Sequence, residues 1–209
     1  MTAINFRSWI KNLLLLILSF CFSLFLAESL LRVTVAPVNY LRPKVVPDDI
    51  LNHKIPPYSG GHDAWGFRNP SVPTTADIVT IGDSMTYGTL ATATHSWPSR
   101  LQTYTGMAVY NLGLGAYGPA QYLYLLEHKA LSLKPSLVIV GLYFGNDFYN
   151  AYEITYKYDY WRFLRNPDAT DPTAKEIQST VIYTTKKKTL FQKARSYMRR
   201  NVILTQVAS

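Results

Sequence analysis

Cysteine and histidine are both scarce in this sequence of 209 residues. The only cysteine is Cys21, so a disulfide within the chain is excluded and cysteine usage does not reveal the redox compartment. All four histidines precede residue 129: His53, His62, His95 and His128. No internal repeat is visible, and a hydrophobic content of 48% excludes wholesale disorder.

Acidic residues are also few, with 13 Asp and Glu against 21 Lys and Arg, for a net charge of +8. Such a surplus is typical of proteins that meet nucleic acids, anionic membranes or acidic polymers. No nucleic-acid-binding motif accompanies it, so we expect no nucleic-acid partner. The surplus is concentrated in residues 151–209, which we interpret as an aromatic and basic insertion followed by a solvated basic helix. Within it, Lys186–Lys188 and Arg199–Arg200 are candidates for contact with anionic lipid headgroups.

Charged residues are missing altogether from residues 13–27, which read LLLLILSFCFSLFLA. A helix that continues to Val35 reaches the roughly 20 residues needed to cross a bilayer. A cleaved signal peptide is the alternative, but Phe25 stands where a small residue is needed two positions before Ala27. We therefore expect residues 1–35 to form an uncleaved single-pass anchor. Because an anchor usually delivers a long following domain across the membrane, we expect that domain on the periplasmic or extracellular side.

The rest of the chain divides into two parts. Residues 36–62 are expected to form an extended tether, because they contain several prolines: Pro37, Pro43, Pro47, Pro56 and Pro57. Residues 63–209 form the predicted domain, which opens with a turn-like cluster over Asp63–Asn69.

The domain begins with strand and helix patterns that alternate, which predicts an α/β fold with a parallel sheet and right-handed crossovers. The predicted strands cover 78–81, 109–114 and 137–144, and the helices 96–104 and 119–133. Ser96 is the expected N-cap of the first helix. The third strand is apolar without alternation, which indicates that helices cover both of its faces.

Each predicted strand ends in a glycine-rich or polar turn. These turns are Gly82-Asp83-Ser84, residues 111–118 and residues 144–147. Because parallel strands place their carboxyl ends at one edge of a sheet, Ser84, the backbone of residues 115–116 and Asn146 are expected to converge there. A hydroxyl nucleophile beside N–H donors suits acyl transfer, since the donors stabilise the developing oxyanion. Asp83 is expected to hold the turn through side-chain hydrogen bonds.

These three blocks resemble those of the SGNH (GDSL-type) hydrolases. The resemblance places Ser84 as the nucleophile, the backbone of Gly115 or Ala116 as one oxyanion donor and the side chain of Asn146 as another. It covers about residues 63–155 and implies a flavodoxin-like three-layer α/β/α sandwich. The implied activity is esterase or carbohydrate O-acyltransferase or deacetylase chemistry on an acyl ester substrate, such as an O-acetylated polysaccharide. We expect neither a cofactor nor a metal site.

The family's last block, an Asp-x-x-His pair that supplies the general base, has no match here. No histidine follows His128, and none of the four has an aspartate three residues earlier. His62 is the one substitute base considered, whereas His95 and His128 are expected at the surface. We expect the chain to be the amino-terminal part of a longer protein or a truncated product, since its sheet also looks incomplete. The alternative is a catalytically inactive remnant that binds saccharides.

Two further patterns have competing interpretations. Residues 113–118 fit G-x-G-x-x-G, but the acidic residue that a dinucleotide site needs near position 138 is missing, so nucleotide binding is not expected. The aromatic stretch 152–163 either stacks on sugar rings or forms an insertion that packs against the missing half of the domain. Beyond it, Thr180–Thr184 is the only candidate for a further strand.

Overall fold

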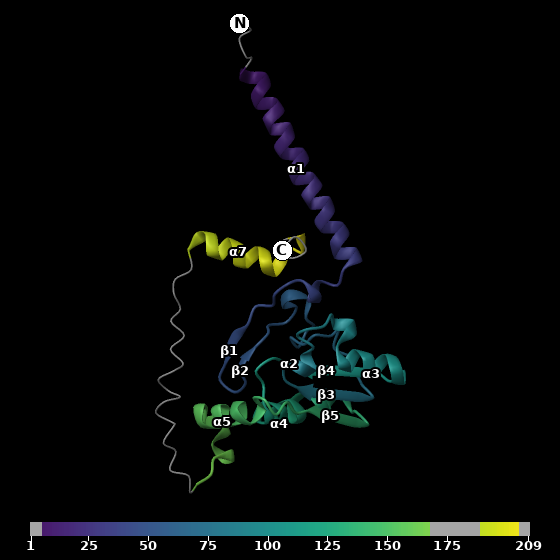
Figure 1. Ribbon diagram of the computed structural model, residues 1–209, viewed down its shortest axis with the longest axis vertical. Coiled ribbons are helices and arrows are strands. Elements are labelled where there is room, and N and C mark those ends of the chain that lie inside the picture. The colour runs from purple at the N-terminus through teal and green to yellow at the C-terminus, as the bar shows by residue number, and fades with distance from the viewer. Residues whose placement is uncertain (1–5, 168–188, 205–209) are drawn as a thin grey trace.

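The computed structural model describes residues 6–167 and 189–204, which form a mixed α/β architecture (Figure 1). A long N-terminal helix, α1, projects from the part of the chain that holds a parallel sheet, and helix α7 lies crosswise near the end of α1. The candidate strand Thr180–Thr184 and the cluster Lys186–Lys188 lie outside the described residues.

Helix α1 spans Phe6–Thr34, and its 29 residues make it about 44 Å long. It contains a stretch of mean hydropathy 2.3, none of whose residues is buried. The helix is therefore long and apolar enough to cross a membrane, as the sequence predicts.

The sheet has the strand order β4-β3-β5, and all its strands are parallel. The strands are β3 (Ile78–Gly82), β4 (Val109–Gly113) and β5 (Leu137–Gly141), which confirms the three predicted strands. The central strand β3 is buried at every residue because it has a neighbour on each side.

The prediction for the third strand is wrong in two respects. Strand β5 ends at Gly141 rather than at residue 144, and its faces are not both covered. Leu137 is 50% exposed and Val140 46% exposed. The reason is position: β5 is an edge strand in the described part of the chain, and an apolar run without alternation does not reveal whether a strand is central.

The helices of the domain connect these strands and follow them. They are α2 (Ser84–Tyr87), α3 (Trp97–Thr105), α4 (Pro119–Leu125) and α5 (Asp147–Lys157), with η6 (Asp159–Leu164) after α5 and α7 over Leu190–Asn201. Ser96 occupies the N-cap position of α3 as predicted, but its Oγ donates to the carbonyl of Ala93, 2.8 Å away, instead of capping the helix.

The longer predicted helix, 119–133, is a regular α-helix only as far as Leu125. It continues as a π turn over Leu126–Ala130 and a short 3₁₀ turn over Leu131–Leu133. Leu125 and Ala130 are both fully buried although they are five positions apart. The wider π turn brings such residues to one side of the helix, which the 3.6-residue repeat of an α-helix does not do.

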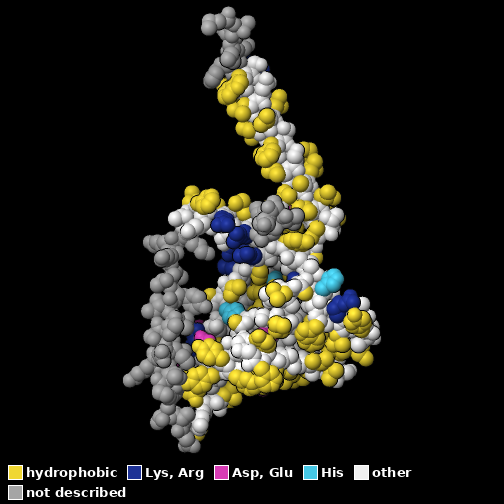
Figure 2. Space-filling model, in the orientation of Figure 1, with side chains coloured by type: hydrophobic (Ala, Val, Ile, Leu, Met, Phe, Trp, Pro, Cys, Tyr) yellow, Lys and Arg dark blue, Asp and Glu magenta, His cyan; other side chains and the backbone are white. Residues whose placement is uncertain are grey.

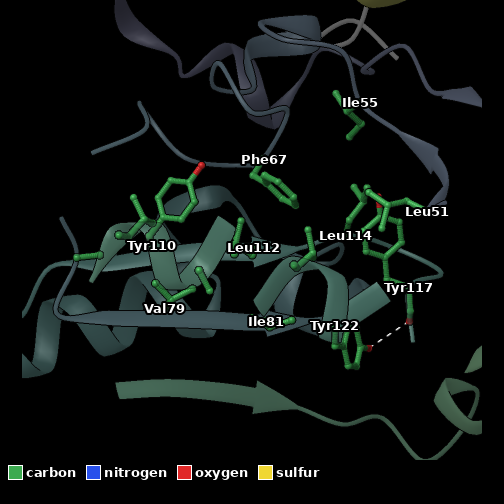
Figure 3. Close-up of a cluster of buried hydrophobic side chains, with 14 residues drawn as sticks. Leu51, Ile55, Phe67, Val79, Ile81, Tyr110, Leu112, Leu114, Tyr117 and Tyr122 are labelled. Carbon is green, nitrogen blue, oxygen red and sulfur yellow. Dashed lines mark hydrogen bonds between the residues drawn. The ribbon is translucent and has the colours of Figure 1, made fainter. Parts of the chain in front are cut away.

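One hydrophobic core lies against β3 and β4 (Figure 3). Val79 and Ile81 of β3 and Leu112 of β4 are completely buried. Figure 3 shows these side chains beside Phe67 and Tyr110, with the segment around residues 51–67 above them. The core also contains Leu51, Ile55, Leu125, Ala130 and Leu133.

Residues 36–62 differ from the expected extended tether, because they fold onto the domain. Strands β1 (Val46–Asp48) and β2 (Asn52–Lys54) form an antiparallel hairpin. Leu51 and Ile55 from this hairpin region enter the core, and the burial of their apolar surface holds the segment down. The prolines therefore shape a folded arm that covers the domain.

The turn Asp63–Asn69 packs on the domain, as predicted. Asp63 Oδ1 accepts hydrogen bonds from the backbone N–H groups of Trp65 and Phe67, and Oδ2 accepts from the hydroxyl of Tyr110 at 2.7 Å. Asn69 exchanges two hydrogen bonds of 3.0 Å with the backbone of Asn111. This turn therefore covers the β4 edge of the sheet.

Candidate functional site

A row of glycines brings α2 directly onto the carboxyl edge of the sheet. Gly82 of β3 lies opposite Gly113 of β4 and Gly141 of β5. A Cβ atom added at Gly82 would lie 2.0 Å from Thr86 Oγ1, and one at Gly113 would lie 2.4 Å from the backbone nitrogen of Tyr87. Any side chain at these positions would push α2 away. This row was not predicted; its signal in the sequence is a glycine at the end of each of the three strands.

Ser84 is the first residue of α2 and follows the central strand directly. Asp83 is the N-cap, and its Oδ1 accepts a 2.8 Å hydrogen bond from the backbone N–H of Met85. Its Oδ2 accepts from Ser84 Oγ at 3.2 Å. The structural role predicted for Asp83 is therefore confirmed, and the hydroxyl of Ser84 is held at the start of the helix, half-buried.

The loop after β4 lies against Ser84. A Cβ atom added at Gly115 would lie 3.7 Å from Ser84 Cβ, which is ordinary contact distance. Ala116, the next residue, adopts φ of 61°, in the left-handed region that glycine takes most readily. The structure thus brings Gly115 close to Ser84. The backbone at Ala116 has the conformation that a glycine would adopt in this turn.

His53 fastens this loop to strand β2. Its Nε2 lies 3.0 Å from the carbonyl oxygen of Gly115, so Nε2 carries the proton in this bond. Its own carbonyl accepts a 2.7 Å hydrogen bond from the hydroxyl of Tyr117. Burial lowers the pKa of His53 below its usual range. His53 therefore positions the loop that carries the expected oxyanion donors.

The third loop begins α5 at the same edge of the sheet. Asn146 is the N-cap of α5, and its Oδ1 is buried without a hydrogen-bond donor among the described residues. Its Nδ2 makes no hydrogen bond within residues 6–167 and 189–204, so it is free to donate to a ligand. Asp147 accepts from the hydroxyl of Tyr122 at 3.0 Å, and burial raises the pKa of Asp147.

Tyr122 connects the second and third loops. Its single hydroxyl proton is shared between Asp147 Oδ2 and the carbonyl oxygen of Tyr117, and the contact with Tyr117 is the dashed line in Figure 3. A Cβ atom added at Gly118 would lie 2.9 Å from the carbonyl oxygen of Asp147. The second loop therefore contacts Ser84 through Gly115 and the start of α5 through Gly118. These contacts place the second loop beside both Ser84 and the start of α5.

The described residues provide no hydrogen bond between a histidine and Ser84. The ring nitrogens of His62, the substitute base considered, lie 2.9 Å from the carbonyl of Ser59 and 3.0 Å from the hydroxyl of Tyr87. His95 and His128 are exposed, as predicted. A hydroxyl without a base is a poor nucleophile, and the described residues place no proton acceptor from a histidine beside Ser84.

Exposed apolar side chains lie next to Ser84 and Asn146 along the chain, and we call Met85, Phe144 and Phe148 the apolar rim. Met85 next to Ser84 is 57% exposed, and Phe144 and Phe148 beside Asn146 are 78% and 60% exposed. The rings of Phe144 and Phe148 lie 5.5 Å apart. This rim offers an apolar surface for an acyl chain or the face of a sugar ring.

Arg68 is a second positioning residue that the sequence analysis did not single out. Its guanidinium donates to the carbonyl of Gly88 at 2.6 Å and to Asn39 Oδ1 at 3.1 Å, and it lies 5.0 Å from the ring centroid of Tyr87. It therefore ties the end of α2 to the N-terminal arm. Its signal in the sequence is that Arg68 is the only charged residue of the turn Gly66-Phe67-Arg68-Asn69.

The aromatic stretch 152–163 is partly packed and partly open. Trp161 is buried, and its Nε1 donates to the carbonyl of Ile50 at 2.8 Å. Tyr160 is 43% exposed and Phe163 64% exposed. One part of this stretch therefore packs as an insertion, while the outer rings remain available to a ligand.

Within residues 6–167 and 189–204, no cluster of His, Cys, Asp or Glu has an arrangement that could hold a metal ion. No family of proteins matches the chain, and neither a curated protein nor a solved structure is similar enough to count as a match.

Proposed function

We propose that this chain is an SGNH-type, GDSL-like hydrolase or O-acyltransferase domain with a flavodoxin-like sandwich. In this proposal α1 anchors it to a membrane, with the domain on the periplasmic or extracellular side, and the substrate is an acyl ester such as an O-acetylated polysaccharide. The observation that carries the proposal is the position of Ser84. It begins α2 above the central strand, with Gly115 in contact distance and the Asn146 loop at the same edge.

The proposed chemistry is attack of Ser84 Oγ on the ester carbonyl carbon. The carbonyl oxygen then takes up negative charge, which the backbone N–H groups of Gly115 and Ala116 and Nδ2 of Asn146 stabilise. The bond to the alcohol oxygen breaks, and an external base, such as added imidazole, carries the serine proton to the leaving alcohol. Water, or an acceptor hydroxyl in the transferase reaction, then attacks the acyl-serine, takes the acyl group and returns a proton through the base to Ser84 Oγ. One such oxyanion donor contributes about 10²–10³ in kcat. The apolar rim around Met85 and Phe144 supports an acyl group at this place.

The first prediction tests this chemistry with the purified full chain in detergent. We expect hydrolysis of p-nitrophenyl acetate that requires Ser84 and that added imidazole, as an external base, accelerates. Ser84→Ala should retain only the background reaction of imidazole with the ester. Asn146→Ala should lower the Ser84-dependent rate by about 10²-fold or more. Equal rates for the parent chain and Ser84→Ala would show that Ser84 is not a nucleophile.

A second candidate function, saccharide binding without turnover, is supported by the hydrogen bond from Ser84 Oγ to Asp83 instead of to a base. In that case Ser84→Ala should bind an O-acetylated polysaccharide as tightly as the parent chain, and neither should release acetate with or without imidazole. Release of acetate by the parent chain alone would exclude this function.

A further inference from the structure

Helix α7 has an apolar face that the described part of the chain leaves open. Its large apolar side chains are strongly exposed: Leu190 by 85%, Phe191 by 75%, Tyr197 by 63% and Met198 by 41%. Their spacing of one and seven residues places them on one side of the helix. Exposed apolar surface of this kind marks a contact with a membrane or another molecule.

The opposite face of α7 is basic and looks toward the N-terminal arm. It borders a pocket of about 450 Å³ whose cationic lining is Arg42, Lys44, Arg195, Arg199 and Arg200. No acidic side chain of the described residues lines this pocket. The neighbouring charge of Arg195 lowers the pKa of Arg199, as expected for cations held together without a counterion. Figure 2 shows Lys and Arg side chains gathered between α7 and the domain.

The end of α7 is fastened to α1 at the boundary of its apolar stretch. Glu28 is the first charged residue after the uncharged residues 13–27. Its carboxylate accepts hydrogen bonds of 3.0 and 3.1 Å from the backbone N–H groups of Ile203 and Leu204. Arg32, one turn later, donates to the carbonyl of Asn201 and pairs with Glu28. These contacts hold α7 at the level where α1 leaves the apolar part of a bilayer.

We propose that α7 is a second membrane contact, which lies in the interface beside α1. Its apolar face enters the boundary between headgroups and acyl chains, and the basic pocket next to it takes the phosphate of an anionic phospholipid. An amphipathic helix with cations on its polar face binds anionic interfaces in this way. Arginine suits phosphate because its guanidinium donates two parallel hydrogen bonds. A second copy of the chain is a poorer occupant, because it would bring the same cations together.

The second prediction places one fluorescent label on each face of α7 in the full chain. Cys21→Ser removes the native thiol, and Met198→Cys or Ser196→Cys then carries the label. Each variant is reconstituted in phosphatidylcholine or in an equimolar mixture with phosphatidylglycerol, with one lipid brominated at a time to quench the label. We expect strong quenching at position 198 and weak quenching at the matched control position 196. Equal, weak quenching at both positions would overturn the interfacial placement.

The same vesicles test the headgroup. Each cation near an anionic surface contributes about fivefold in binding. Brominated phosphatidylglycerol should therefore quench the label at position 198 several-fold more efficiently than brominated phosphatidylcholine. The double variant Arg195→Glu/Arg199→Glu should lose this preference, while the matched variant Arg100→Glu/Arg162→Glu, with the same change in net charge elsewhere, should keep it. No preference in the parent chain would overturn the headgroup site. Self-quenching between labels at position 198 without lipid quenching would point to a second copy instead.

Discussion

Ala116 adopts a backbone conformation, φ of 61°, that costs an L-residue about 1–2 kcal/mol and costs glycine nothing. The strain persists because His53 fixes the turn on both sides of Ala116. The ring of His53 donates a hydrogen bond to the carbonyl oxygen of Gly115, and the carbonyl oxygen of His53 accepts one from the hydroxyl of Tyr117. At the scale of single residues, the sequence predicted Ala116 as an oxyanion position, but it did not predict the histidine that holds this loop. His53 lies 62 residues before Gly115, and no local pattern connects the two.

The third prediction concerns this strain. Ala116→Gly should raise the free energy of unfolding by about 0.5–1 kcal/mol, because relief of about 1–2 kcal/mol outweighs the added entropy of the unfolded chain, about 0.5–1 kcal/mol. The measurement is urea unfolding of the chain in detergent, followed by tryptophan fluorescence. Ala151→Gly, inside the regular helix α5, is the control and should have the opposite sign. A loss of stability for both variants would contradict the strain.

At the scale of elements, helix α2 depends on contact with the sheet more than on its own sequence. It is only 4 residues long, too short to be stable alone, and it rests on the glycine row. Asn111 Nδ2 donates to the carbonyl of Thr86 at 3.0 Å and so ties the helix to β4. The strand ends were predictable from residue types. The contact was not, since it requires that strands separated by many residues align in register.

The fourth prediction tests that contact. Gly113→Ala would place a Cβ atom 2.4 Å from the backbone nitrogen of Tyr87, so α2 has to move. We expect a loss of about 1–3 kcal/mol, as for overpacked cores, together with loss of any Ser84-dependent hydrolysis. Gly115→Ala, two residues later, meets nothing closer than 3.7 Å and should change stability by less than about 0.5 kcal/mol. Thermal unfolding of both variants measures this difference in stability. Equal stability of the two variants would show that α2 moves away from the added Cβ atom without a cost in free energy.

At the scale of the whole molecule, the N-terminal arm, residues 36–62, supplies part of the hydrophobic core. The sequence predicted a core formed by the domain, residues 63–209, alone. Leu51 and Ile55 are buried in the core, His62 is also buried, and His53 is half-buried. Burial lowers the pKa values of both histidines. The unfolded chain therefore takes up protons near pH 6.5, while the folded chain takes them up only at lower pH.

The fifth prediction follows from this difference. Since the unfolded state binds more protons just below pH 6.5, stability should fall as the pH drops through that value, by no more than about 1.4 kcal/mol per pH unit for each histidine. Thermal unfolding between about pH 8 and about pH 5.5 measures the slope. His62→Gln should reduce it, and His95→Gln, at an exposed position, should leave it unchanged. If stability still falls with pH to the same extent in a variant that lacks both His53 and His62, other titratable groups cause the pH dependence.

The sequence by itself determined the membrane-length helix, the three strands and the Ser84 turn, because each depends on a run length, a residue period or a turn within a few residues. Only the tertiary structure decided that β5 is an open edge, that the proline-rich arm covers the core and that α7 is fastened to Glu28. These features arise from contacts between distant parts of the chain. Their free energy comes from burial and hydrogen bonds that exist only once those parts meet.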